Sequence, residues 1–299
     1  MASTSTVNPL NAMEESPNWL EMPHELMANI LQRLDDVEIL NSALKVCTTW
    51  WRICKDPAMW KVIDMHRPID ARDVDYDLEA LTKQAVHLSC GELIDFSISG
   101  FGTDDLLDYI LLSSSKLNSL CLTDCYNITS SGLSRGLERV PQLEKLHISY
   151  TSWRVNYSEV IVPNCPQLKS FKLDKECIEI GLTNDDDALA IAENMPELRH
   201  LQVFGNKMTN TGLQAILDGC PHLESLDVRT CYNINIFGDE VKLCKERIKN
   251  FKCPGDSIEN CTFLPPFHVY VDPNNQWGDY EHYDDGFYYD DYDDPSDYI

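Results

Sequence analysis

The segment from residue 117 to residue 148 reads LNSLCLTDCYNITSSGLSRGLERVPQLEKLHI, and its pattern decides the fold. It begins with LNSLCL and ends with LEKLHI, so that apolar residues recur in the spacing LxxLxL. Between these two runs, a polar turn leads into a helical pattern from Thr129 to Val140, and Pro141 ends that pattern. The segment therefore predicts one strand–turn–helix unit followed by the strand of the next unit.

The same apolar spacing recurs along most of the chain. Seven runs of this kind begin at residues 93, 117, 143, 168, 198, 223 and 248, which places them 24 to 30 residues apart. A period of 20 to 29 residues is typical of leucine-rich repeats, in which each unit stacks on its neighbours to build a continuous core. We therefore expect an α/β fold over residues 93–255, a strand–turn–helix solenoid of about seven units that curves into a horseshoe.

The second half of several units has a helical pattern. Thr103, followed by Leu106, Leu107 and Ile110, gives an N-cap and then an apolar helix face. The predicted helices are Thr103–Leu112, Thr129–Val140, Asp186–Met195 and Asn210–Leu217. Prolines 141, 166, 196 and 221 precede the next strands, where they end a helix without removing a ladder hydrogen bond.

The concave face of the predicted sheet is a candidate binding surface. We call the apolar residues of the LxxLxL runs the anchors. If the anchors point inward, the residues that alternate with them line the opposite face of the sheet. The candidate target-binding residues are Lys145, His147, Tyr150, Lys172, His200, Gln202, Phe204, Asp227 and Arg229. Two alternatives stay open for this mixed-charge set: recognition of a protein or peptide, or a solvated sheet face without a ligand.

The negative charge of the chain is concentrated near its end. The sequence has 24 Lys and Arg against 49 Asp and Glu, a net charge of −25, and the segment Asp272–Ile299 carries −10 of it without any Lys or Arg. We expect residues 256–299 to form a disordered tail rich in Tyr and Asp. The tail either keeps the chain soluble or folds back over Lys145, Lys172 and Arg229. The acid excess disfavours nucleic acid and anionic membrane surfaces as partners.

The sequence offers no motif for chemistry. It has no phosphate-binding glycine loop, no GxSxG and no HExxH, so we expect no catalytic residue, metal or cofactor. No run of about 18 apolar residues indicates a membrane span. The 12 cysteines lack a CxxC pair and none is marked as an activated nucleophile, so we expect reduced thiols and a location in the nucleus, the cytoplasm or both.

The N-terminal part predicts a small helical domain. Residues 1–16 read as a disordered leader, residues 17–65 as three short helices, and residues 66–92 as a connector and cap before the repeats. Pro23 suits the first turn of the first helix. The helical segment has more apolar and aromatic surface than it can bury alone, so we expect it to dock on its own solenoid or on a separate partner.

This segment resembles an F-box. The residues that carry the resemblance are MPHEL at 22–26, VCTTWW at 46–51 and AMW at 58–60, with Met22 where the family usually has Leu. The runs from Cys125 to Thr129 and from Gly132 to Leu133 resemble the cysteine-containing class of leucine-rich repeats. Over residues 17–255 the chain is most similar to plant F-box proteins with leucine-rich repeats, of the Skp-interacting type.

The resemblance implies a substrate receptor of an SCF-type ubiquitin ligase, a protein that is not itself an enzyme. The F-box would dock on a Skp-type adaptor, which links it to cullin and RING subunits, and the repeats would capture a target protein. By position in the motif, the adaptor contacts would be Pro23, Leu26, Ile30, Leu31, Val46 and Trp50. Some of these, Ile30 and Val46 in particular, could instead belong to the helical core. The acidic tail leaves a second reading, a leucine-rich repeat chaperone for basic proteins.

Overall fold

A computed structural model describes residues 22–66, 77–149, 160–161, 163–174 and 183–257. Within these ranges the strands form one sheet of eight parallel strands, which follow one another in chain order. The strands are β1 Val62–His66, β2 Asp95–Ser99, β3 Ser119–Thr123, β4 Lys145–Ser149, β5 Ser170–Asp174, β6 His200–Phe204, β7 Ser225–Asp227 and β8 Asn250–Lys252. Strand order that equals chain order is the topology of a solenoid, in which each repeat contacts its neighbours.

The leucine spacing produces this register directly. Phe96, Leu120, Leu146, Phe171 and Leu201 lie opposite one another on consecutive strands, and each is almost completely buried. Because side chains alternate along a strand, aligning one anchor in each repeat places the remaining anchors on the same face. All seven predicted strands are present, β2 to β8.

The sheet begins one strand earlier than the repeat pattern predicts. Strand β1, Val62–His66, lies at the end of the segment assigned to the helical domain and pairs with β2. Ile63 and Met65 are fully buried in it, but the sequence before them lacks the first leucine of the LxxLxL spacing. The LxxLxL spacing therefore does not reveal β1, which couples the helical domain to the sheet.

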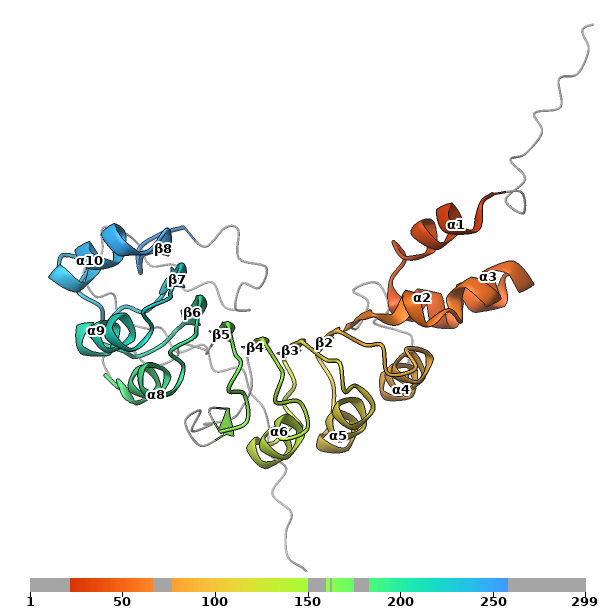
Figure 1. Ribbon diagram of the computed structural model, residues 1–299, viewed down its shortest axis with the longest axis horizontal. Helices are drawn as coiled ribbons and strands as arrows, with labels where there is room; N and C mark the ends of the chain where they lie inside the picture. The colour runs from red at the N-terminus through yellow and green to blue at the C-terminus, as the bar shows by residue number, and fades with distance from the viewer. Residues whose placement is uncertain (1–21, 67–76, 150–159, 162, 175–182, 258–299) are drawn as a thin grey trace, which may run out of the picture. The chain divides into compact units, whose positions relative to one another are not determined.

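The helices of the repeats lie along one side of the strands (Figure 1). They are α4 Leu78–Leu88, α5 Asp104–Ser113, α6 Ser130–Leu137, α8 Asp186–Asn194, α9 Asn210–Gly219 and α10 Asp239–Arg247. The four helices predicted from the sequence correspond to α5, α6, α8 and α9. Helix α4 lies in the predicted connector, and it contacts both α5 and β1, so it completes the first repeat.

The N-terminal domain contains the three predicted helices. They are α1 His24–Leu31, α2 Asp36–Asn41 and α3 Thr48–Cys54, with short 3-10 turns at Ala43–Lys45 and Pro57–Trp60. Trp60 is fully buried, and its indole N–H donates to the carbonyl of Cys54 at 2.7 Å. Helix α2 packs against α4 and β1, so the helical domain and the first repeat share one core.

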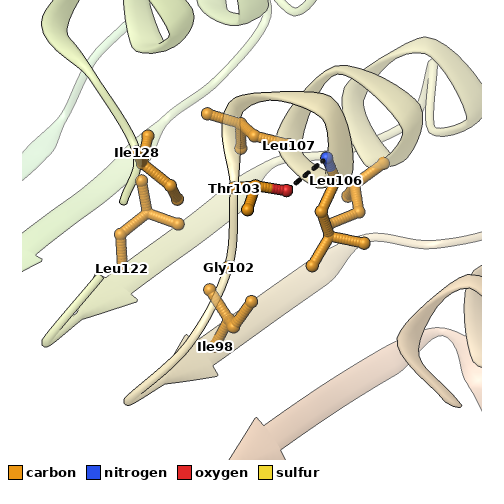
Figure 2. A pocket seen from close by; sticks show the side chains of 8 residues that line it. Ile98, Gly102, Thr103, Leu106, Leu107, Leu122 and Ile128 are labelled. Carbon is orange, nitrogen blue, oxygen red and sulfur yellow. Dashed lines mark hydrogen bonds between the residues drawn. The ribbon is translucent and has the colours of Figure 1, made fainter. Parts of the chain in front are cut away.

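Figure 2 shows how apolar side chains of two successive repeats fill the space between them. Ile98 of β2, Leu106 of α5 and Ile128 all contribute to the same apolar cluster. Thr103 begins α5 by accepting a hydrogen bond from the backbone N–H of Leu106 at 3.3 Å. Gly102 has φ of +116°, a conformation that side chains rarely adopt, and a Cβ there would lie 3.1 Å from Ile98. The turn between strand and helix therefore depends on glycine.

In the part of the chain that the structure describes, no helix is long and apolar enough to cross a membrane. The predicted leader at 1–16 lies outside the described residues, as do Tyr150 and nearly all of the predicted acidic tail.

Candidate functional site

Helix α1 presents apolar side chains on two adjacent faces. Met27 and Leu31 are buried against the helical core, while Leu26 is 54 % exposed and Ile30 is 38 % exposed. Pro23 precedes the first turn and is also exposed. A stable helix needs only one apolar stripe to hold it on its domain, so the second stripe is a candidate contact for another protein.

The neighbouring helix α3 adds further exposed apolar surface. Val46, just before α3, is 58 % exposed, and Trp51 within it is 46 % exposed. Lys55 lies over the Trp51 ring, with Nζ 4.5 Å from the ring centroid. Trp50 is half-buried and packs against the core. Because α1 packs against α3, the exposed residues of the two helices belong to one small domain.

The structure separates the predicted adaptor contacts into surface and core. Pro23, Leu26, Ile30 and Val46 are on the surface, so neither Ile30 nor Val46 belongs to the internal core. Leu31 is completely buried, and its predicted place on the surface is wrong because its position, four residues after Met27, keeps it on the inner stripe. Trp51 was not selected from the sequence, although its place next to Trp50 puts it on a different face of the helix.

On the concave face, three basic side chains occupy adjacent strands. Lys145 on β4, Lys172 on β5 and His200 on β6 are exposed, as predicted. Strand register places Lys145 and His200 on either side of Ser170, and Lys172 directly opposite Gln202. These side chains form a basic row on a protein of net charge −25.

A hydrogen-bonded cluster crosses the sheet beside this row. His147 Nδ1 lies 3.2 Å from the sulfur of Cys121 on β3, and His147 Nε2 lies 3.1 Å from Asp174 Oδ2 on β5. Ser149 donates to the same Asp174 oxygen at 2.8 Å, and Gln202 donates to the other at 2.9 Å. Strand β5 lies between His147 on β4 and His200 on β6.

The electrostatics of the cluster favour charged forms of both His147 and Cys121. Burial lowers the pKa of His147, but the hydrogen bonds to Asp174 and Cys121 outweigh it and raise that pKa to about 9. Burial raises the pKa of Cys121, and the hydrogen bond and charge of His147 outweigh that effect and lower it overall. The sequence alone does not mark Cys121 as an activated cysteine. The feature that could have indicated its contact with His147 is that the two residues occupy equivalent positions in successive repeats.

The C-terminal end of the concave face is built differently from the prediction. Phe204, Asp227 and Arg229 were expected to be exposed, and all three are buried. The Arg229 guanidinium pairs with Asp227 and lies over the Phe204 ring, 5.0 Å from its centroid. Lys252 Nζ lies 3.2 Å from Asp227. Side-chain pairing between and along strands, which alternation alone does not reveal, removes these residues from the accessible face.

Across the described ranges, no group of three or more His, Cys, Asp or Glu side chains is arranged to hold a metal ion.

Comparisons with known proteins agree with both parts of the fold. Residues 19–66 match the F-box-like family model, and residues 195–217 match a leucine-rich repeat model. The chain is 49 % identical over 262 residues to the F-box protein SKIP19 of Arabidopsis thaliana, with 87 % of this chain and 85 % of that protein covered. It is also 50 % identical over 243 residues to the putative F-box/LRR-repeat protein 23 of the same plant. That match spans 80 % of this chain but only 54 % of the length of that relative.

Among solved structures, one similar fold is that of a chain in the crystal structure of the Rad7 and Elc1 complex in yeast. The TM-score is 0.50 at 13 % sequence identity, over 76 % of this chain and 61 % of that chain. At this identity the similarity concerns the fold alone.

Proposed function

This chain belongs to the F-box proteins with leucine-rich repeats, and on that premise we propose that it is the target-recognition subunit of an SCF-type ubiquitin ligase. In this proposal the α1–α3 domain docks on a Skp-type adaptor, and through it on cullin and RING subunits. The repeats bind a target protein and hold it near the conjugating enzyme that carries ubiquitin as a thioester. The chain contributes proximity, which raises the effective concentration of target lysines at the thioester.

The observation that carries the proposal is the exposed apolar stripe of the helical domain. Leu26 and Val46 are each more than half exposed, although both occur in a domain that already has a buried core. Burying one such side chain in a partner contributes roughly 1.5–3 kcal/mol before the cost of association. The two residues lie within the segment that matches the F-box-like model.

For the target, the exposed basic row favours an acidic segment. Lys145, Lys172 and His200 can contact a single extended chain because they lie on three adjacent strands of the same face. Charge complementarity of this kind increases the association rate and the specificity more than the final affinity.

The adaptor contact is tested with surface charge substitutions in the full-length chain. Leu26→Asp and Val46→Asp should each abolish co-elution with a purified plant Skp-type adaptor, because each would bury an unpaired carboxylate at the interface. Leu112→Asp is the matched control, since Leu112 is 68 % exposed on α5, outside the helical domain, and should leave binding unchanged. Co-elution of the Leu26→Asp/Val46→Asp double variant at wild-type affinity would refute the proposal.

A further inference from the structure

The Cys121–His147–Asp174 cluster has a chemistry that target recognition by itself does not require. We propose that Cys121 is a peroxide-sensitive modification site, whose thiolate is oxidised to a sulfenic acid on the concave face of the repeats. The inference is independent of the ligase role, because it concerns the reactivity of one side chain in the isolated protein.

The geometry is that of an oriented sulfur–imidazole pair. Cys121 and His147 are directly opposite each other on β3 and β4, and the sulfur lies 3.2 Å from Nδ1. Asp174 contacts the other imidazole nitrogen at 3.1 Å and is itself held by hydrogen bonds from Ser149 and Gln202. A nucleophile, a base and a third group that orients the base form the arrangement that activates cysteines. Here it spans three adjacent strands, which fix the spacing.

The charges around the sulfur favour the thiolate. A protonated His147 between Cys121 and Asp174 faces a negative group at each nitrogen, which stabilises the imidazolium and, through it, the thiolate. The charged groups on the packed strands and the following turn are Asp95 on β2, Asp124 after β3, Lys145 on β4, and Lys172 and Asp174 on β5. Lys172 on β5 lies opposite His147 on β4, on the side away from Cys121, so His147 is the cationic group in contact with the sulfur.

Solvent access and a lowered pKa together distinguish Cys121 from the other described cysteines whose pKa is shifted, because Cys253, which is also half-buried, has a raised pKa. Cys121 is half-buried, whereas Cys125, Cys165 and Cys220 are buried, and burial raises the pKa of each of these three. Sensor cysteines combine thiolate character with solvent access. Cys121 has both properties, and the buried thiols have neither.

The proposed step balances with a peroxide as the oxidant. The Cys121 thiolate attacks one peroxide oxygen, so that an S–O bond forms while the O–O bond breaks. With hydrogen peroxide, the departing hydroxide takes the proton of the His147 imidazolium and leaves as water. The sulfur loses two electrons and the peroxide gains two. The product is a Cys121 sulfenic acid beside a neutral His147, which removes the ion pair from the concave face.

The test uses the reduced full-length chain, treated with hydrogen peroxide in the presence of dimedone, which traps sulfenic acids. Peptide mass spectrometry then follows each cysteine separately from pH 6 to pH 9. At pH 6.5, Cys121 should be trapped at least tenfold faster than Cys90, which is more exposed and whose thiol donates to the His87 carbonyl at 3.8 Å. Faster trapping of Cys90 than of Cys121 throughout this range would overturn the proposal.

Variants of the imidazole and its partner show whether the cluster is the cause. His147→Gln keeps a polar side chain but removes the cation, so the trapping rate of Cys121 at pH 7 should fall about tenfold and its pH profile should move toward an ordinary thiol near 8.5. Asp174→Asn should shift the profile in the same direction. Cys125 is buried in the folded protein, so its continued protection from oxidation and dimedone trapping in the same samples establishes that each variant is folded. An unchanged Cys121 profile in folded His147→Gln would refute the mechanism.

If neither variant folds, the wild-type profile alone decides. A midpoint below that of an ordinary thiol, about 8.5, supports the proposal, and a midpoint at or above that value overturns it.

Discussion

The Arg229 guanidinium donates to both carboxylate oxygens of Asp227, from Nε at 2.9 Å and from Nη2 at 2.8 Å. Both side chains are almost completely buried, at 5 % and 7 % exposed. Arg229 also donates to the carbonyl of Ser257 at 2.6 Å, which connects β7 with the segment after β8. The pair therefore stabilises the C-terminal end of the solenoid.

Removing one member of this pair should destabilise the protein strongly. Arg229→Met leaves the Asp227 carboxylate buried without its main partner, and losses of about 3–5 kcal/mol are typical of a broken buried pair. Lys252 lies close enough to Asp227 to compensate in part, so we expect the lower end of this range in the free energy of unfolding by urea.

The double variant Asp227→Asn/Arg229→Met is the control, because it removes both charges. It should be more stable than Arg229→Met alone, and the difference measures the penalty of the unpaired carboxylate. A single variant within about 0.5 kcal/mol of wild type would mean that the pair does not hold this end of the fold.

Two leucines of α1 should differ sharply in their effect on stability. Leu31 is completely buried, so Leu31→Ala should lower the free energy of unfolding by about 2–5 kcal/mol. Leu26 is 54 % exposed, and the same substitution there should cost less than about 1 kcal/mol. Chemical denaturation of both variants measures the two losses for the same Leu→Ala substitution. Equal losses would contradict the assignment of Leu31 to the core and Leu26 to the surface.

The seven repeat strands could be predicted from the sequence because their anchors are all apolar and evenly spaced. Residues such as Leu120 and Leu146 are inside for the same local reason, the alternation of side chains along a strand. Strand β1 could not be found in this way, since Ile63 and Met65 alternate correctly but Trp60 stands at the position of the first leucine. Its place in the sheet comes from pairing with β2.

The concave face was only partly predictable. Lys145 and Lys172 are exposed, as alternation requires, but Asp227, which aligns with Lys172 through Gln202, is buried, and so is Arg229 two residues later. The difference arises from side-chain pairing in three dimensions. The Cys121–His147 contact joins residues 26 apart, and no local pattern reports which polar side chains will meet across strands.

A glycine in α6 should be sensitive to the smallest side chain. Asp104 accepts hydrogen bonds from both the N–H and the hydroxyl of Thr129, each at 2.7 Å, and a Cβ on Gly132 would overlap the Asp104 carboxylate. Gly→Ala within a helix ordinarily stabilises by about 1 kcal/mol. Here we expect Gly132→Ala to destabilise, by about 1–3 kcal/mol, because the carboxylate must move and lose both hydrogen bonds.

The carboxylate is responsible if its removal relieves the clash. In an Asp104→Ala background, Gly132→Ala should cost clearly less than it does alone, which a thermodynamic cycle of thermal or urea unfolding measures. A stabilising effect of Gly132→Ala in the wild-type background would contradict the close approach of α5 and α6.

Asp36 connects the helical domain to the sheet in a half-buried position. Its Oδ2 accepts a hydrogen bond from the backbone N–H of Asp64 on β1 at 2.6 Å. Burial, assisted by the nearby negative charges of Asp35 and Asp64, raises the pKa of Asp36 to about 6, although the Asp64 hydrogen bond and His66 act against the shift. The folded protein therefore binds a proton at Asp36 more tightly than the unfolded chain does.

This shift gives stability a definite pH dependence. The contribution of Asp36 is fully present below pH 3.8 and is lost as the pH rises through about 6, because only the ionised form is penalised by burial. Asp36→Asn, which stays neutral and can still accept from Asp64, should be more stable than wild type at pH 7.5 by about 1–3 kcal/mol. Between pH 7.5 and pH 5 this advantage should shrink by about 1–2 kcal/mol, as measured by urea unfolding. An advantage that stays constant over this range would show that the Asp36 carboxylate is not the titrating group.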